Sequence, residues 1–228
     1  MSIFSKLLAP AGVALCALAA LPAAAQVDGR VATIDISRAV LGTTAFQTAY
    51  EQVNQTYAQQ NELRRTKAQE RQTLLQTFDT NGDKQVDDAE LAAKQNSPQF
   101  AQLQTLEQEI QGLTNQIDAA RIYAVEQVIA QYGAALQEVT TQQQIKLVID
   151  PASLQFAVPE ADITQKITTA LNAKVPNVGI VPPQGWQPSR EGVQLYQEIQ
   201  QRLLTAQLIQ QRQQQQQQQG NPQAPAGR

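Results

Sequence analysis

The sequence of 228 residues carries a formal net charge of −3, and only 16% of its residues are charged and 5% aromatic. It contains no histidine and one cysteine, which argues against the commonest base–nucleophile pairs and most transition-metal sites. The net acidic charge argues against nucleic acid as a partner. We therefore expect no catalytic residues and favour a binding or structural protein over an enzyme.

Residues 1–25 have the pattern of a secretory signal. Lys6 supplies a positive start, residues 7–21 are mostly apolar, and three alanines ending at Ala25 fit a cleavage site. The apolar run of about 15 residues is shorter than the roughly 20 of a membrane-spanning helix. We therefore predict export to the periplasm and cleavage after Ala25. Cys16 would leave with the signal, so the mature chain would contain no disulfide.

Two apolar segments predict short strands on either side of the central part of the chain. Residues 31–36 (VATIDI) alternate β-branched residues, and residues 145–149 (IKLVI) form a second strand pattern. A third strand is predicted over 154–158 (LQFAV). With their neighbours, these segments define a small β body made of residues 26–44 and 145–175.

Short helices are predicted beside these strands. Ser37 would cap a helical stretch over 38–41. Asp162 or Thr164 would cap a second helix over 163–171, where apolar residues recur at every fourth position. Both helices would belong to the β body.

Between the strands, residues 45–144 predict two long helices that fold back on each other. The first, over 44–78, has apolar residues at 4-3-4 spacing within Phe46–Tyr57 and little to bury after them. The second, over 97–144, repeats apolar residues at spacings of three and four. Helices of roughly 35 to 45 residues would make an arm on the order of 50–70 Å long. We predict that this antiparallel coiled-coil arm projects from the β body.

The composition changes after the β body. Residues 176–188 form a proline-rich linker around Trp186, which we expect to dock the extension on the body. A helix is predicted over 189–212, followed by a disordered, glutamine-rich tail over 213–228. The predicted fold class is therefore α+β and mostly α, with a helical-hairpin arm on a small β body.

The segment FDTNGDKQVDDAEL, from Phe78 to Leu91, has the ligand spacing of an EF-hand calcium loop. Gln85 would contribute its backbone carbonyl, and Glu90 both carboxylate oxygens. Lys84 stands where a left-handed backbone favours glycine, which costs about 1–2 kcal/mol. We therefore expect weak Ca²⁺ binding by the EF-hand-like loop 79–90. The six candidate metal ligands are Asp79, Asn81, Asp83, Gln85, Asp87 and Glu90.

The same segment also has an interpretation without a metal. Asn81-Gly82 favours a turn, and Asp87 with Glu90 can form a capping box for a short helix. This polar hairpin tip uses the same side chains, so the spacing alone leaves both interpretations open.

Two segments resemble the Skp/OmpH family of periplasmic chaperones. They are VATIDISRAV at 31–40 and IKLVIDPASLQFAVPEADITQKITTAL at 145–171. The order of strand, helix out, helix back, strand and helix matches as well, so the resemblance covers about residues 31–175. It implies a homotrimer whose three arms enclose a cavity, in which unfolded outer-membrane proteins are held without ATP. This family has no catalytic residues, and none are carried over.

The predicted arm is more acidic than the strongly basic members of this family. Residues 46–144 contain seven Lys and Arg and thirteen Asp and Glu, a net charge of −6. Contact with an anionic membrane surface is therefore left open. Two other functions also stay open: a Ca²⁺-responsive binding module, and a structural coiled coil that links layers of the envelope.

Overall fold

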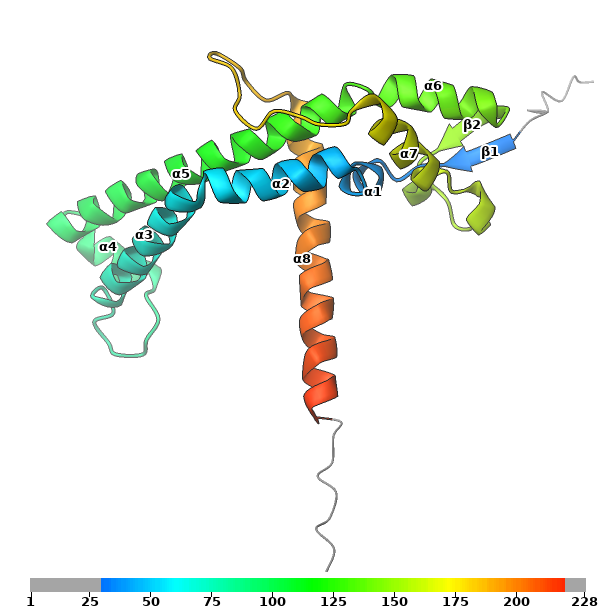
Figure 1. Cartoon of the computed structure of the whole chain (residues 1–228). Coiled ribbons are helices and arrows are strands. Elements are labelled where there is room, and N and C mark those ends of the chain that lie inside the picture. Colours follow the sequence, from blue (N-terminus) through cyan, green and yellow to red (C-terminus); the bar gives the residue numbers. More distant parts are fainter. Residues whose placement is uncertain (1–29, 220–228) are drawn as a thin grey trace, which may run out of the picture.

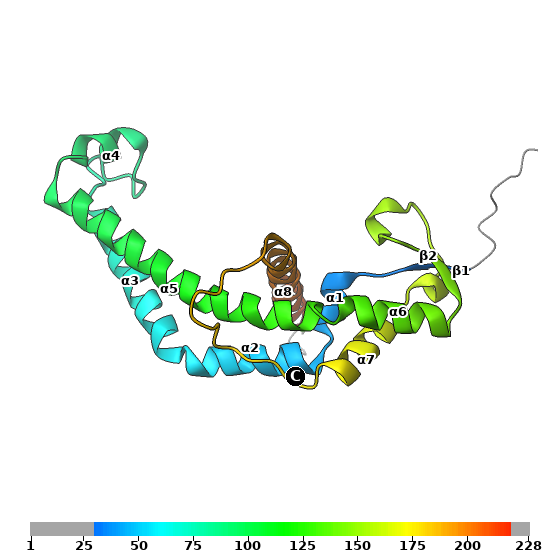
Figure 2. The same ribbon diagram turned by 90° about the horizontal axis from the view of Figure 1, so that it is seen from above.

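The computed structural model describes residues 30–219, so the predicted signal segment lies outside the described residues. Figures 1 and 2 show a long helical arm with a small sheet at one end, a folded tip at the other, and a further helix crossing the arm between them. The elements in chain order are β1 (Arg30–Thr33), α1 (Ile36–Leu41), α2 (Thr44–Thr56), α3 (Ala58–Gln76), α4 (Asp88–Lys94), α5 (Pro98–Ile129), α6 (Tyr132–Gln142), β2 (Ile145–Ile149), α7 (Thr164–Lys174) and α8 (Arg190–Gln219).

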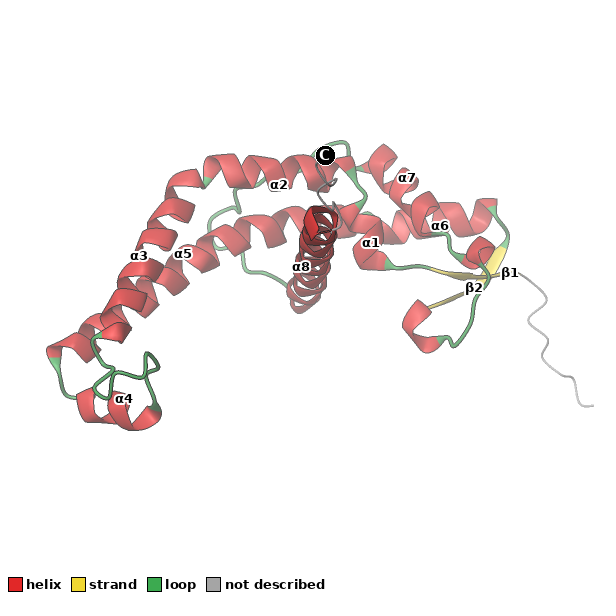
Figure 3. Ribbon diagram, turned by 90° about the horizontal axis from the view of Figure 1, so that it is seen from below, coloured by secondary structure: helices red, strands yellow, loops and turns green. Residues whose placement is uncertain are grey.

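The sheet of the described residues has two strands. β1 and β2 pair in parallel, with Val31 opposite Leu147 and Thr33 opposite Ile149, and the whole helical arm forms the crossover between them. Figure 3 shows how small this sheet is beside the helices. A parallel pair requires a crossover of about a dozen residues or more, so the arm between the two strands is compatible with this pairing.

The predicted third strand over 154–158 is wrong within this single chain. The segment lies between two 3₁₀ turns, Pro151–Ser153 and Pro159–Ala161, and it makes no ladder with β1 or β2. Phe156 in its middle is 81% exposed. A strand needs a neighbouring backbone for its hydrogen bonds, and no ladder among the described residues includes this segment. The single bridge between Thr33 and Asp162 lies beyond it.

The predicted helix caps in the body need correction. Asp35, rather than Ser37, caps α1, because its carboxylate accepts a hydrogen bond from the backbone N–H of Arg38. The hydroxyl of Ser37 is buried and donates to Asp35. At α7 the residue in the cap position is Ile163, although the carboxylate of Asp162 still accepts from the backbone N–H of Thr164.

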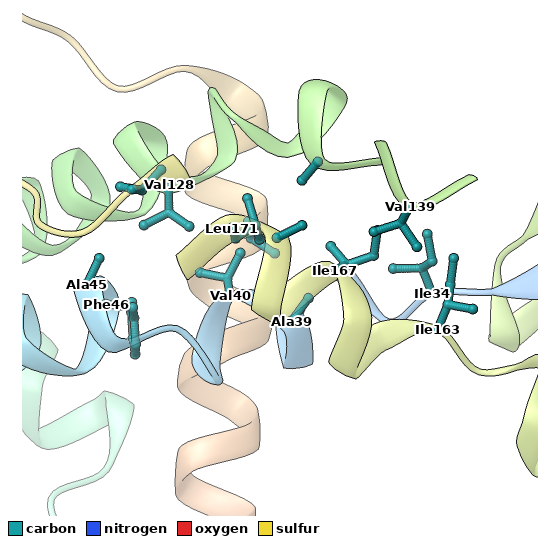
Figure 4. Packing of buried hydrophobic residues seen from close by; sticks show 14 of the residues in the cluster. Ile34, Ala39, Val40, Ala45, Phe46, Val128, Val139, Ile163, Ile167 and Leu171 are labelled. Carbon is teal, nitrogen blue, oxygen red and sulfur yellow. The ribbon is translucent and has the colours of Figure 1, made fainter. Parts of the chain in front are cut away.

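The core of the body forms where α1, α6 and α7 meet against the sheet and the end of α5 (Figure 4). Ile167 and Leu171 on α7 are fully buried, and so is Val40 on α1. On α7 the buried residues, among them Thr164, Ile167, Thr168 and Leu171, recur at spacings of three and four, which puts their side chains on one face of the helix. Packing of this α7 face therefore holds together segments from both ends of the crossover.

Both long arm helices are interrupted, although each was predicted as continuous. The first is broken at Tyr57, which joins α2 to α3 with φ −101° and ψ 23°. The second is broken at Ala130 and Gln131, between α5 and α6. Tyr57 is buried in a small cluster with Val53, which lets the chain change direction there without losing packing. Beyond this break no residue of α3 is buried, as the fading apolar stripe predicts.

The C-terminal extension returns to the arm. Trp186 donates from its indole N–H to Glu126 of α5 over 3.2 Å and packs edge-on against Tyr123. Trp186 therefore docks the linker, and the contact is with α5. Gly192 at the start of α8 packs against the Glu126 side chain, so a larger residue there would force that side chain to move.

Helix α8 crosses the body and then leaves it. Leu195, Tyr196 and Ile199 are buried against α1 and α5, whereas Leu204 and Leu208 are about half exposed. The helix continues to Gln219, so the prediction of a disordered segment from residue 213 is wrong up to that residue. Glutamine has a good helix propensity, which favours this continuation. Across residues 30–219, no helix combines the length and the apolar character that crossing a membrane requires.

Loss of the Asp162 charge is expected to weaken the body at low pH. Partial burial works to raise the pKa of Asp162, but hydrogen bonds from Thr164 and the ion pair with Arg38 hold it below its ordinary value. A depressed folded-state pKa contributes stability above the unfolded pKa of about 3.9, and this stability is lost as the pH falls through the folded value.

We expect Asp162→Asn to reduce the difference between urea midpoints measured at about pH 6 and about pH 3. The exposed neighbour Glu160 provides the control, as Glu160→Gln. An unchanged pH dependence in Asp162→Asn would contradict the role of this carboxylate.

Candidate functional site

The tip of the arm contains an ordered loop and a short helix instead of a simple turn between α3 and α5. The chain leaves α3, passes through the loop 79–87, and folds back through α4 onto the start of α5 (Figure 2). Phe78 anchors the beginning of the loop, because its ring is 1% exposed. At the other side Ser97 caps α5, accepting a hydrogen bond from the backbone N–H of Phe100, with Pro98 in the first turn as expected.

The first half of the loop is organised by the carboxylate of Asp79. One oxygen accepts from the backbone N–H of Gly82 over 2.6 Å, and the other from that of Lys84 over 2.8 Å. Gly82 and Lys84 both have positive φ, at 78° and 66°. Lys84 therefore adopts the left-handed backbone that its place in the predicted loop requires, although glycine would do so at lower cost.

Two further ligand candidates continue the same turn. The side-chain oxygen of Asn81 accepts from the backbone N–H of Asp83, and Asp83 accepts from that of Gln85, over 2.8 and 2.7 Å. The amide of Asn81 also donates to the second oxygen of Asp83. These short-range hydrogen bonds satisfy the loop backbone, which explains how an exposed polar segment holds a defined conformation.

The predicted capping box of Asp87 and Glu90 is confirmed. Asp87 accepts from the backbone N–H of Glu90, and Glu90 accepts from that of Asp87. Glu90 reaches further, because its other oxygen accepts from the backbone N–H groups of Thr80 and Asn81 and from the hydroxyl of Thr80. These hydrogen bonds lower the pKa of Glu90, and the one from the backbone N–H of Thr80 has the largest effect. Desolvation of the carboxylate acts in the opposite direction. This buried carboxylate therefore ties the two ends of the loop together.

Five of the six predicted ligands thus lie in the loop, and Glu90 lies in the first turn of α4. The side-chain oxygens of Asp79, Asn81, Asp83, Asp87 and Glu90 accept mainly from backbone N–H groups. Within residues 30–219, no three or more His, Cys, Asp and Glu side chains are grouped so that they could hold a metal ion. The donor chemistry suits Ca²⁺, whereas the positions of the oxygens favour the metal-free turn. Calcium binding therefore stays a prediction.

Beside the loop lies a cavity of about 950 Å³ that the sequence reasoning missed. It opens between the end of α3, the loop, α4 and the start of α5. The only signal in the sequence is a set of apolar residues in and around the polar loop, from Leu75 to Leu103. The apolar residues that line the cavity are Leu75, Val86, Leu91, Phe100 and Leu103.

The basic residues of α3 face acidic residues of α5. Lys67 donates to Glu109 over 2.6 Å, and this hydrogen bond raises the pKa of Lys67. Arg71 lies 3.9 Å from Glu107. These pairs are partly exposed, so they add little to the stability of the arm.

The sheet end of the body exposes apolar side chains. Val31 and Leu147, which are paired across β1 and β2, are 44% and 42% exposed, and Val158 is 49% exposed. Phe156 is exposed as well, so this end of the body presents several apolar side chains to solvent beside a sheet of two strands. Such a sheet is barely stable by itself, and its free edge is a template for another chain.

Comparison with known proteins identifies the group to which this fold belongs. The family model described as "Outer membrane protein (OmpH-like)" matches residues 30–171, which span β1 to α7. This chain belongs to the OmpH-like family. The match covers the sheet, the whole arm and the core helix, and it ends before the linker and α8. The OmpH-like proteins are outer membrane protein chaperones and not enzymes.

A solved structure gives a weaker likeness. A candidate outer membrane chaperone (OmpH-like) from Caulobacter crescentus is 19% identical, with 79% of this chain and 96% of that chain covered, at a TM-score of 0.39. This score is too low to support the arrangement of the elements. A comparison with curated proteins found no match.

Proposed function

We propose that this OmpH-like chain is a periplasmic holdase chaperone, which binds unfolded outer-membrane β-barrel proteins between helical arms without ATP. The family match carries the proposal, and the arm supports it. Past Tyr57, α3 has no buried residue, and its contact with α5 is made largely by polar side chains over a thin apolar row. Helices held together so weakly can adjust to a client, and weak adaptable contacts suit clients without a fixed shape.

We propose further that three copies assemble through the sheet end of the body. The exposed apolar surface of Val31, Leu147 and Phe156 supports this, as does the open edge of β2. Pooling strands between subunits would cover this surface and remove free edges. The segment 154–158 has a strand pattern but no strand partner among residues 30–219, and it would gain one from a neighbouring subunit.

The experiment measures the mass of the mature chain by light scattering on a sizing column. The sample is run alone and with a β-barrel protein diluted from urea. We expect a mass of three chains, and a soluble complex with the client. Phe156→Asp should give a lower mass because a charge would enter the subunit interface, whereas the exposed neighbour Gln155→Asp should not. A monomeric wild-type chain that leaves the client to aggregate would overturn the proposal.

We infer weak Ca²⁺ binding to the loop 79–90 as a second proposal. It is supported by Lys84, which already has the left-handed φ of 66° that an EF-hand loop needs at this place. Glu90, however, would have to exchange its four hydrogen bonds for the metal. We therefore expect binding only at roughly millimolar Ca²⁺, the weak end of the range for such loops.

Calorimetry with millimolar Ca²⁺ checks this prediction. Heat of binding is expected for the wild-type chain and not for Asp79→Ala, which removes the first ligand. Asp88→Asn, a charge change next to the ligand set but outside it, is the control and should bind as the wild type does. No heat in any of the three proteins would sink the calcium proposal and leave the capping-box tip as the explanation of the motif.

A further inference from the structure

We propose that the cavity at the arm tip is a client-binding site, which takes one large apolar side chain of an extended, unfolded polypeptide. This inference rests on the proposed holdase function and names the place on the arm where a client segment is gripped. The cavity of about 950 Å³ lies within the size range of small-molecule pockets, about 300–1,000 Å³. It can therefore enclose a leucine or an aromatic ring with part of its backbone.

The floor of the cavity is apolar and comes from four parts of the tip. Leu75 ends α3, Val86 belongs to the loop, Leu91 to α4, and Phe100 begins α5. Each of these four side chains is only partly buried, so part of its apolar surface still faces solvent. Covering it with an apolar side chain would remove this surface from water, which favours binding.

The rim of the cavity suits an unpaired peptide backbone. Gln72, Gln76 and Gln104 line it, and each carboxamide has both an acceptor oxygen and N–H donors. An extended client segment presents the same two kinds of group, with no partner for them until the client folds. Carboxamides at the rim can pair with that backbone in any sequence, while the floor selects for apolar side chains.

The charges around the cavity balance. Arg71 is paired with Glu107 across it, and the remaining charged residues of the lining are Asp79 and Lys84. Two positive and two negative residues give no net charge to attract an anionic headgroup or a cation. This balance favours an uncharged occupant, and an apolar side chain of a polypeptide meets that requirement.

A cavity with an apolar floor on each arm also suits a client that will become a β-barrel. Strands of membrane barrels alternate apolar and polar residues, so every second residue of an extended segment is a candidate for the floor. One cavity on each arm of an assembly would hold the same client at several places. Weak single contacts then combine through effective concentration, which gives retention without tight binding at any one site.

The test uses the mature full-length chain with a fluorescent label at the rim. Gln76→Cys carries an environment-sensitive dye, and Gln69→Cys, exposed on the same helix outside the cavity, is the matched control. The probes are a β-barrel protein diluted from urea and a synthetic peptide of one barrel strand. We expect both probes to change the emission of the dye at position 76 and to leave that at position 69 unchanged.

A second pair of variants tests the floor. Val86→Asp places a charge against the bound side chain and should weaken binding of the strand peptide about tenfold. Leu63→Asp, at an exposed apolar residue of α3 outside the cavity, should bind the peptide as the wild type does. Circular dichroism of both variants checks that the arm remains helical. If Val86→Asp loses structure, the dye-labelled Gln76→Cys protein, whose floor is unchanged, still tests the cavity.

The outcomes separate the two proposals. A wild-type chain that keeps the barrel soluble while the dye at position 76 does not respond would overturn the cavity inference and leave the holdase function standing. A wild-type chain that leaves the barrel to aggregate would overturn the holdase function. In that case the response of the same dye to the strand peptide decides whether the cavity binds apolar segments.

Discussion

Replacing Leu171 by alanine is expected to lower the free energy of unfolding by about 2–5 kcal/mol. Leu171 is fully buried on α7, in the cluster where α1, α6 and the end of α5 meet (Figure 4). The lost side chain leaves a cavity that its neighbours can fill only in part, because each belongs to a different helix. The loss is a large share of the 5–15 kcal/mol that stabilises a typical domain.

Urea unfolding followed by circular dichroism, at one fixed protein concentration, measures this effect. The concentration matters because any assembly would add to the apparent stability. Leu208→Ala is the matched control, since Leu208 is 48% exposed on the projecting half of α8 and should change stability by about 0.5 kcal/mol or less. A loss below about 1 kcal/mol for Leu171→Ala would contradict the central place of α7 in the core.

Replacing Ile199 by aspartate is expected to release α8 from the body. Ile199 is 0% exposed, and a carboxylate without a partner at that place would cost several kcal/mol. Next to it the hydroxyl of Tyr196 donates to Asp118 over 2.6 Å. Burial is the main cause that raises the pKa of this tyrosine, and the hydrogen bond to the Asp118 carboxylate is the second. The phenol therefore stays protonated and keeps donating to Asp118. This one hydrogen bond is too weak to hold α8 in place against the cost of the buried aspartate charge at position 199.

Limited trypsin digestion checks the release of α8, because Arg202 on this helix is held by Asp35 at 2.6 Å in the docked state. We expect faster cleavage at Arg202 in Ile199→Asp, since an isolated helix of this length is marginal in water. Leu204→Asp changes a residue that is 57% exposed on the same helix and should be cleaved at the wild-type rate. Equal rates for all three proteins would show that α8 is not held through Ile199.

The local pattern of the sequence was sufficient for much of this fold. The alternation in 31–36 predicted the first strand, although the strand ends at Thr33 and Ile36 already begins α1, and the apolar run 145–149 predicted the second. The apolar stripe from Phe46 to Tyr57 predicted both the helix and the place where its packing weakens. The capping box at Asp87 and Glu90 was also readable, because a cap involves groups only three residues apart. Features of this kind depend on neighbours in the sequence, so the sequence by itself determined them.

The remaining features depend on residues that are distant in the sequence, and only the tertiary structure decided them. The sequence predicted that Trp186 docks the extension, but only the tertiary structure identified its partners, Tyr123 and Glu126 on α5. The segment 154–158 has a strand pattern and forms no strand, since pairing requires a second backbone and none of the described residues supplies one. The tip cavity arises from four segments at once, and a hollow between elements has no signature in the spacing of any one of them.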